Sequence, residues 1–256
     1  MHRFISLSLI LFFNQTWADS VNSNQVLIPA GTYSPFFKTV KDQDIAIKSF
    51  YLDKFPVSNN EFHEFLIQNS KFNKSKIASL FADQRYLQQF KADLLTENEK
   101  IEIGSKPVTN VSWFVAKKYC QSKGLRLPTI AEWEYASDAN NPGVLEDLLG
   151  WYAKTGTVPL EKIGEKKPNK FGVCDMHGLI WEWVEDFSSV MISSDSRSKG
   201  DRTDGFFCGG GSVSSLDSKA YATFMRYGFR SGLRGDYCMQ NLGFRCAMDN
   251  KPGSTK

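Results

Sequence analysis

Two carboxylates, Asp175 and Glu182, lie on either side of a turn that contains Gly178. Carboxylate oxygens, together with backbone carbonyls that a glycine turn leaves free, are the hard oxygen ligands that Ca²⁺ accepts in flexible geometry. The pattern therefore indicates a calcium site. The alternative is a surface turn whose acidic side chains are solvated, and the spacing alone does not decide between the two.

Three arginines, Arg226, Arg230 and Arg234, recur at every fourth position, which on an α-helix places them on one face. Because a guanidinium holds carboxylates and amides by paired donors, Arg226 is a candidate for binding an anionic or amide group of a substrate. A structural salt bridge is the alternative, and it is the stronger interpretation for Arg230. Glu185 and Asp186 are candidate acid–base groups, although such acids are usually only solvated.

The cysteines and histidines limit the metal chemistry. Only His63 and His177 follow the first 18 residues, and no cysteines form a C-x-x-C pair, so a zinc site or a multi-histidine iron site has too few ligands. Cysteines of exported proteins are more often bridged than free, and an odd number leaves at least one unpaired. The five cysteines are Cys120, Cys174, Cys208, Cys238 and Cys246.

The first 18 residues have the pattern of a secretory signal peptide. A basic start precedes the apolar run of residues 4–13, and Thr16 and Ala18 are small residues at a suitable cleavage position. The run is too short for a stable membrane-spanning helix, so an uncleaved anchor is the minor alternative. We therefore expect a signal peptide at 1–18, one domain at 19–256, a periplasmic or secreted protein, and no membrane association after cleavage.

The net charge excludes one class of partner. It is +3 for the whole sequence, and removal of Arg3 with the signal peptide leaves +2. The lysine-rich segment 161–170 is interrupted by glutamates and indicates a solvated loop. A chain so close to neutrality, without a basic block, is not expected to bind nucleic acid.

Capping residues and periodicity predict an α+β fold. Ser58 and Thr129 each begin a capping box, and Ser112 begins a segment that ends at Gly124. The residues after Gly143 are rich in turns, which predicts a long irregular region. The predicted strands are 26–32 and 45–55, and the predicted helices begin after Ser58 and cover 73–100, 113–123 and about 130–139.

Four blocks of sequence carry the most specific signal. They are residues 28–33 with 50–59; 111–113 with 119–120, 126–129 and 131–136; 168–169 with 171–172, 175–178 and 181–186; and 210–212 with 241–247. In this order they resemble the formylglycine-generating-enzyme, or sulfatase-modifying factor, family. The resemblance covers the chain from about residue 26 to its end. It implies a C-type-lectin-like core with much irregular structure.

The resemblance also implies metal ligands. At the turn described above, the positions that match the calcium ligands of the family are Asp175, Gly178, Ile180 and Glu182, of which Gly178 and Ile180 would act through backbone oxygens. Ca²⁺ is therefore the expected cofactor. A second calcium site of the family, expected between residues 152 and 168, has no ligands that we can match.

The resemblance further implies a disulfide between Cys120 and Cys246. The other common bridge of the family is absent, because Ser137 replaces one of its partners. Cys208 and Cys238 either form a substitute bridge or are free thiols near the site, and the sequence leaves both alternatives open.

The cysteine pair that defines the family's reaction is missing. Family members bind copper(I) through two cysteines shortly after the Gly-Gly-Ser block, since soft thiolates suit this ion. Counting from residues 210–212, the matching positions are Ser215 and Ala220; counting back from Cys246, they are Asp217 and Ala222. No cysteine occurs from 213 to 229, so neither copper binding nor standard formylglycine generation is expected.

Residues 208–211 and 221–231 resemble a cysteine-free branch of the family, which includes a periplasmic pyoverdine-maturation protein and a nitrite-reductase accessory protein. This resemblance implies an exported maturation factor that acts on a peptide, siderophore-like or protein client. A maturation enzyme predicts a deep polar cleft beside Ser215 and Arg226. Its candidate catalytic residues are Arg226, Ser215, Cys208 and Glu185.

Two alternatives remain open. A non-catalytic client-binding or chaperone module predicts an open apolar groove, and a function that survives loss of the Arg226 side chain. A formylglycine-generating oxidase that uses displaced thiols requires Cys208 and Cys238 to be unbridged. The sequence identifies neither the client nor the redox step.

Overall fold

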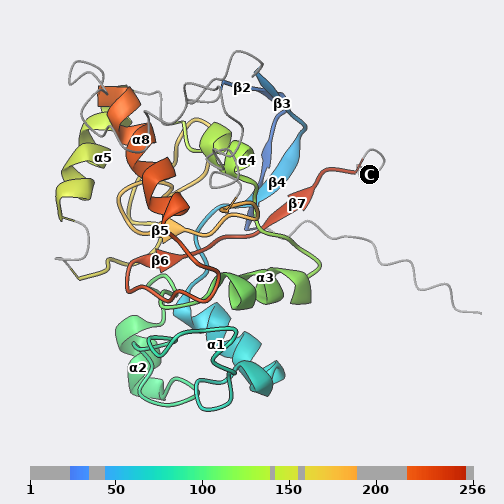
Figure 1. Ribbon diagram of the computed structural model, residues 1–256, viewed down its shortest axis with the longest axis vertical. Helices are drawn as coiled ribbons and strands as arrows, with labels where there is room; N and C mark the ends of the chain where they lie inside the picture. The colour runs from blue at the N-terminus through green and yellow to red at the C-terminus, as the bar shows by residue number, and fades with distance from the viewer. Residues whose placement is uncertain (1–23, 35–43, 139–141, 155–158, 189–217, 252–256) are drawn as a thin grey trace, which may run out of the picture.

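The computed structural model describes residues 24–34, 44–138, 142–154, 159–188 and 218–251 (Figure 1). The predicted signal peptide lies outside these residues. Short strands and helices alternate with long irregular segments, which confirms the predicted α+β class. Within the described segments, no helix has the length and apolar character needed to cross a membrane.

The main sheet joins both ends of the described chain. Strands β1 (Gln25–Ile28), β4 (Phe50–Asp53) and β7 (Ala247–Asp249) pair antiparallel in the order β1-β4-β7. In β4 the alternating side chains Phe50 and Leu52 are buried, as expected for a strand with one face on the core. Residues almost two hundred positions apart therefore share one sheet.

The predicted strand 45–55 is two strands. Its first part, β3 (Ile45–Ile47), pairs with β2 (Gly31–Tyr33), whereas β4 pairs with β1 after a break at Lys48 and Ser49. The alternation of apolar and polar residues predicts extended backbone correctly, but it does not reveal the change of partner.

The helices with capping signals are confirmed. Helix α1 (Asn59–Gln68) begins after the capping box of Ser58 and Glu61, and α4 (Ile130–Ala136) after that of Thr129 and Glu132. Helix α3 (Trp113–Ser122) has Ser112 as its N-cap. Gly124, just beyond α3, has a φ of 72°, the left-handed conformation that favours glycine after a helix.

The helix predicted for residues 73–100 is mostly wrong. Residues 70–72 form a short 3₁₀ helix (Ser70–Phe72), turns follow, and regular helix returns only in α2 (Glu97–Ile103). Polar side chains satisfy the backbone locally: Asp83 accepts a hydrogen bond at 2.9 Å from the backbone N–H of Arg85, two positions later. Such bonds compete with helix formation.

The described part of the region predicted to be irregular after Gly143 includes two helices. Helices α5 (Pro142–Lys154) and α8 (Ser218–Ser231) contact each other and lie side by side on one flank of the molecule (Figure 1). The short parallel strands β5 (Trp181–Glu182) and β6 (Leu242–Gly243) lie between this flank and the centre. The composition of the residues after Gly143 is typical of turns and did not indicate either helix.

Aromatic side chains fill the centre of the core. Phe62 of α1 and Tyr119 of α3 stack with ring centroids 5.7 Å apart, and Phe244 meets Tyr119 edge-on at 5.2 Å. All three are buried, and burial of each such side chain contributes roughly 1.5–3 kcal/mol. The predicted disulfide is present: Cys120 of α3 bonds to Cys246, just before β7.

Candidate functional site

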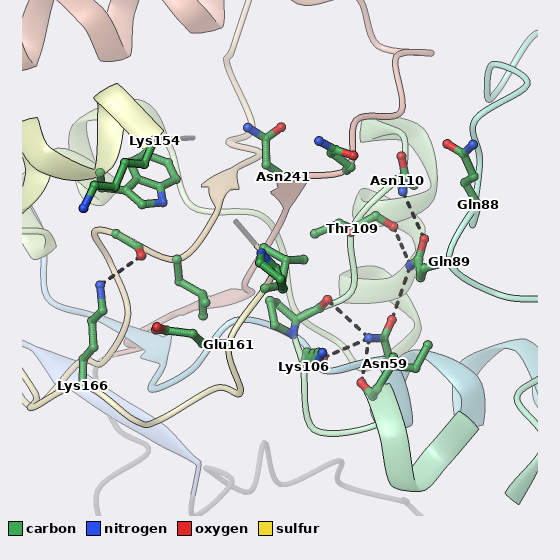
Figure 2. Close-up of a pocket in the computed structure, with 18 of the residues that line it drawn as sticks. Asn59, Gln88, Gln89, Lys106, Thr109, Asn110, Lys154, Glu161, Lys166 and Asn241 are labelled. Carbon is green, nitrogen blue, oxygen red and sulfur yellow. Dashed lines mark hydrogen bonds between the residues drawn. The ribbon is translucent and has the colours of Figure 1, made fainter. Parts of the chain in front are cut away.

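A pocket of about 1120 Å³ opens between α1, the end of α2, the end of α5 and the loops that connect them (Figure 2). Its polar lining is dominated by carboxamide side chains from four separate parts of the chain. These are Asn59, Gln88, Gln89, Asn110, Gln240 and Asn241. Sequence reasoning missed this site, although the neighbouring pairs at 88–89 and 240–241 are visible in the sequence.

Three of the carboxamides form a hydrogen-bonded chain along one wall (Figure 2). Asn110 donates through Nδ2 to Gln89 Oε1 at 3.2 Å. Gln89 donates through Nε2 to the Thr109 carbonyl at 2.9 Å and to Asn59 Oδ1 at 3.4 Å. Asn59 in turn donates to the backbone carbonyl of Ile103 at 2.9 Å. The wall is therefore held in a fixed arrangement before any ligand binds.

One acceptor in this wall lacks a donor. Asn110 is only 4% exposed, and its Oδ1 has no hydrogen-bond partner among the residues that the structure describes. A buried amide oxygen without a donor costs about 1–3 kcal/mol. The oxygen is itself inaccessible to solvent, so this cost belongs to the wall and is not removed by a ligand in the pocket.

Backbone strain holds the same wall in place. Asn110 and Leu87 have φ angles of 51° and 47°, in the left-handed region that a buried leucine rarely adopts. The two residues are linked, because the Leu87 N–H donates to the Asn110 carbonyl at 2.9 Å. Conformations of this kind cost about 1–3 kcal/mol each and cluster at ligand-binding sites. Here they fix the positions of Gln88 and Gln89.

The opposite side of the pocket is charged. Lys154, Lys166 and Glu161 lie across from Gln88 and Asn110 (Figure 2). The charged residues lining the whole pocket comprise three lysines and one glutamate, which favours a ligand with an anionic group on this side.

Apolar side chains complete the pocket and bear on the class of ligand. The aliphatic residues Ile103, Leu160 and Leu179 line it together with the carboxamides. Planar carboxamides pair with the N–H and C=O groups of a peptide, and aliphatic walls accept peptide side chains. The described lining contains neither cysteine, histidine nor serine.

Arg226, the principal predicted substrate-binding residue, has a buried partner. Its Nε and Nη2 donate to Glu134 of α4 at 2.9 and 2.7 Å, and both side chains are 2% exposed. Arg230 donates to the same carboxylate at 2.7 Å. Burial alone would raise the pKa of Glu134, but the two guanidinium groups lower it to about 2. Both arginines therefore lie where a structural salt bridge requires them, and neither lines the pocket.

The predicted acid–base residues, Glu185 and Asp186, have different partners. Glu185 pairs with Lys117 of α3, and its second oxygen has no hydrogen-bond partner among the described residues. Asp186 accepts a hydrogen bond at 2.7 Å from the backbone N–H of Ile130, the first residue of α4. Asp186 thus satisfies a free N–H at a helix N-terminus. Neither acid lines the amide-rich pocket.

The predicted thiol and hydroxyl groups are only partly described. Cys208 and Ser215, which we predicted to line a cleft beside Arg226, lie outside the described residues. Cys238 is a buried free cysteine, and burial, reinforced by Asp83, raises the pKa of its thiol to about 12. Cys174 is likewise free and buried, with a raised pKa. Such thiols are poor sources of the thiolate that copper(I) requires.

The predicted calcium ligands lie around one turn, but two of them already accept hydrogen bonds from cationic side chains. Both carboxylate oxygens of Glu182 accept from Arg245, at distances down to 2.8 Å, and the Gly178 carbonyl accepts from Lys166 at 2.9 Å. Asp175 accepts from the Gly164 N–H at 2.6 Å. In the described part of the chain, no three His, Cys, Asp or Glu side chains form a group suited to a metal ion. This donor set does not fit an open cation site, and calcium binding stays a prediction.

Comparison with known proteins shows the family. The family model for the sulfatase-modifying factor enzyme 1-like domain (FGE-sulfatase) matches residues 14–250. The chain is 28% identical to the formylglycine-generating enzyme of Bos taurus, over 90% of this chain and 76% of that protein. It is 25% identical to the inactive C-alpha-formylglycine-generating enzyme 2 of Bos taurus, over 94% of each chain.

A third relative has a different description. The chain is 23% identical to the chaperone protein LppX of Paenibacillus barcinonensis, over 66% of this chain and 74% of that protein. Relatives of this chain are therefore described as active enzymes, an inactive homologue and a chaperone. With a family model that spans nearly its whole length, the chain belongs to the sulfatase-modifying factor family.

Proposed function

We propose that this protein is an exported maturation factor that holds a peptide segment of a client in the amide-rich pocket, and that it does not generate formylglycine. The observation that carries the proposal is the carboxamide-rich wall of the pocket, in which hydrogen bonds hold Asn59, Gln89 and Asn110 in place before any ligand binds. An extended peptide offers N–H and C=O groups to carboxamides such as that of the exposed Gln88. The lysines opposite favour a client segment with an acidic side chain or a terminal carboxylate.

Several features support binding over oxidation. The pocket is polar, as expected for a maturation enzyme, but Arg226 is not part of it. The thiols of Cys174 and Cys238 are buried with raised pKa values, and the positions that match the copper-binding cysteines carry none. The likeness to a protein described as a chaperone agrees with a client-binding role. The disulfide supports location outside the cytoplasm, where such bonds persist.

Selection from a library of short random peptides tests the proposal. We expect the purified protein to enrich peptides that carry an acidic residue, and neutral oligosaccharides to give no heat of binding in calorimetry. Asn110→Gly removes the hydrogen bond that holds Gln89 in the wall, while glycine suits the left-handed backbone. It should weaken binding of a selected peptide by about 10-fold, which corresponds to roughly 1.4 kcal/mol.

Two further variants separate binding from folding. Gln88 is exposed at the pocket edge, so Gln88→Ala should weaken peptide binding without lowering the thermal midpoint. Gln121 is an exposed residue of α3 outside the pocket, so Gln121→Ala should bind like the unaltered protein. The proposal fails if no peptide is enriched, if oligosaccharides bind instead, or if Asn110→Gly and Gln88→Ala both keep full affinity.

A further inference from the structure

The turn at residues 175–182 gathers two acidic and two basic side chains. Asp175 and Glu182 are both buried, Arg245 pairs with Glu182, and Lys166 donates to the Gly178 carbonyl of the same turn. The formal charges of the four groups cancel without an additional ion. A divalent cation here would add two positive charges to a set that is already balanced.

Arg245 donates hydrogen bonds to the kind of oxygen atoms that would coordinate a calcium ion. Its side chain is fully buried, and it donates to both oxygens of Glu182. Its remaining donors reach the backbone carbonyls of Cys174 at 2.9 Å, Asp53 at 3.1 Å and Lys54 at 3.2 Å. A carboxylate and several carbonyls are a typical oxygen set for Ca²⁺. Here the planar guanidinium occupies the centre of that set.

Both carboxylate oxygens of Glu182 already accept hydrogen bonds. In addition to Arg245, its Oε2 accepts from the indole N–H of Trp133 at 2.7 Å. Removing the guanidinium from a fully buried carboxylate leaves an uncompensated charge, which is strongly unfavourable. A calcium ion would therefore have to share or break this pair.

Lys166 contacts the turn at Gly178. Its ammonium donates to the Gly178 carbonyl, one of the four predicted calcium ligands, at 2.9 Å. Gly178 has a φ of 82°, and a Cβ at this position would lie 2.3 Å from the Lys166 Nζ. Glycine thus provides both the left-handed turn and the space for the ammonium group.

We propose that Arg245 and Lys166 replace the divalent cation at this turn, so that this chain holds its 175–182 segment without calcium. The inference concerns the family's metal position and does not depend on the client-binding role. It predicts a protein whose fold is insensitive to calcium and to chelators.

Metal analysis and thermal unfolding test the inference on the purified full-length protein. We expect less than stoichiometric calcium after dialysis, and the same unfolding midpoint with added calcium or with EGTA. One equivalent of retained calcium, or a midpoint several degrees lower in EGTA, overturns the proposal.

A matched pair of lysine variants tests the ammonium itself. Lys166→Met, at an exposed side chain, should lower the midpoint by about 2–4 °C, the shift expected from one lost charge-assisted hydrogen bond in a chain of this size. Lys167→Met changes the exposed neighbour and should leave it unchanged. Calcium should raise the midpoint of Lys166→Met alone. Equal midpoints for the two variants, or no calcium response in Lys166→Met, overturn the claim that ammonium and ion share one position.

Discussion

Arg226 and Glu134 form a buried ion pair that ties helix α8 to helix α4. The Nη2···Oε2 distance is 2.7 Å, and Arg230 reaches the other oxygen of the same carboxylate. Charges removed from water in this way stabilise a fold only while every partner is present. The sequence segment that we expected to bind a substrate therefore helps to hold the scaffold together.

Replacing Glu134 should destabilise the protein severely. Glu134→Ala leaves two buried guanidinium groups without their partner, and we expect a loss of about 3–5 kcal/mol in the free energy of unfolding. Denaturant titration followed by circular dichroism measures the change. Glu97→Ala, which removes an exposed partner of Lys100, is the matched control and should cost less than about 1 kcal/mol. Similar small losses in both variants would contradict the structural role.

The same carboxylate should make stability depend on pH in acid. The pKa of Glu134 is lowered from its ordinary 4.5 to about 2 in the folded state. The unfolded chain therefore takes up this proton first, and stability from the pair is complete above pH 4.5 and lost as the pH falls toward 2. Carbon-detected NMR of the Glu134 carboxyl should show a midpoint far below 4.5. A midpoint at or above 4.5 would show that the pair does not form in solution.

The disulfide should contribute a large share of stability. Cys120 and Cys246 are 126 positions apart, and closing so long a loop stabilises by about 4–5 kcal/mol in the chain-entropy description. We expect Cys120→Ser/Cys246→Ser to lose this amount in denaturant titration. A reducing agent should destabilise the unaltered protein similarly and the double variant no further. If reduction has no effect on the unaltered protein, the bridge is not formed.

The protein should not convert cysteine to formylglycine. Its described free thiols are buried with raised pKa values, and residues 213–229 contain no cysteine. After loading with copper(I) and incubation with a cysteine peptide in air, mass spectrometry should find the peptide unoxidised to aldehyde. A formylglycine-generating enzyme treated in parallel provides the positive control. An aldehyde product, or copper retained at one equivalent, would revive the oxidase alternative.

Local signals predicted the elements that depend on local bonds. The capping boxes at Ser58 and Thr129 each consist of residues three positions apart, so the sequence contains the whole motif. The resemblance to the family supplied the pairing of Cys120 with Cys246, which spacing alone does not determine. Capping and periodicity supplied the α+β class, although alternation in such short strands did not reveal which strands pair.

The pocket depended on contacts that no local pattern records. Asn59, Gln89 and Asn110 come from three segments and meet only after folding. Arg226 shows the same limit in another way. The four-residue spacing of the arginines is visible in the sequence. The buried partner of Arg226, Glu134, lies 92 positions earlier in the chain. A periodic sequence pattern indicates which side chains share one face of a helix, but it does not indicate which element packs against that face.

The pairing of β7 with β4 has a consequence for how the protein is made. Strand β4 is completed early in synthesis, but its partner Ala247–Asp249 and the cysteine at 246 follow almost two hundred residues later. A sheet closed by such distant segments forms slowly, because the cost of ordering the chain precedes the gain from contact. The sheet therefore lacks its third strand, and Cys120 its partner, until residues 246–249 have been synthesised.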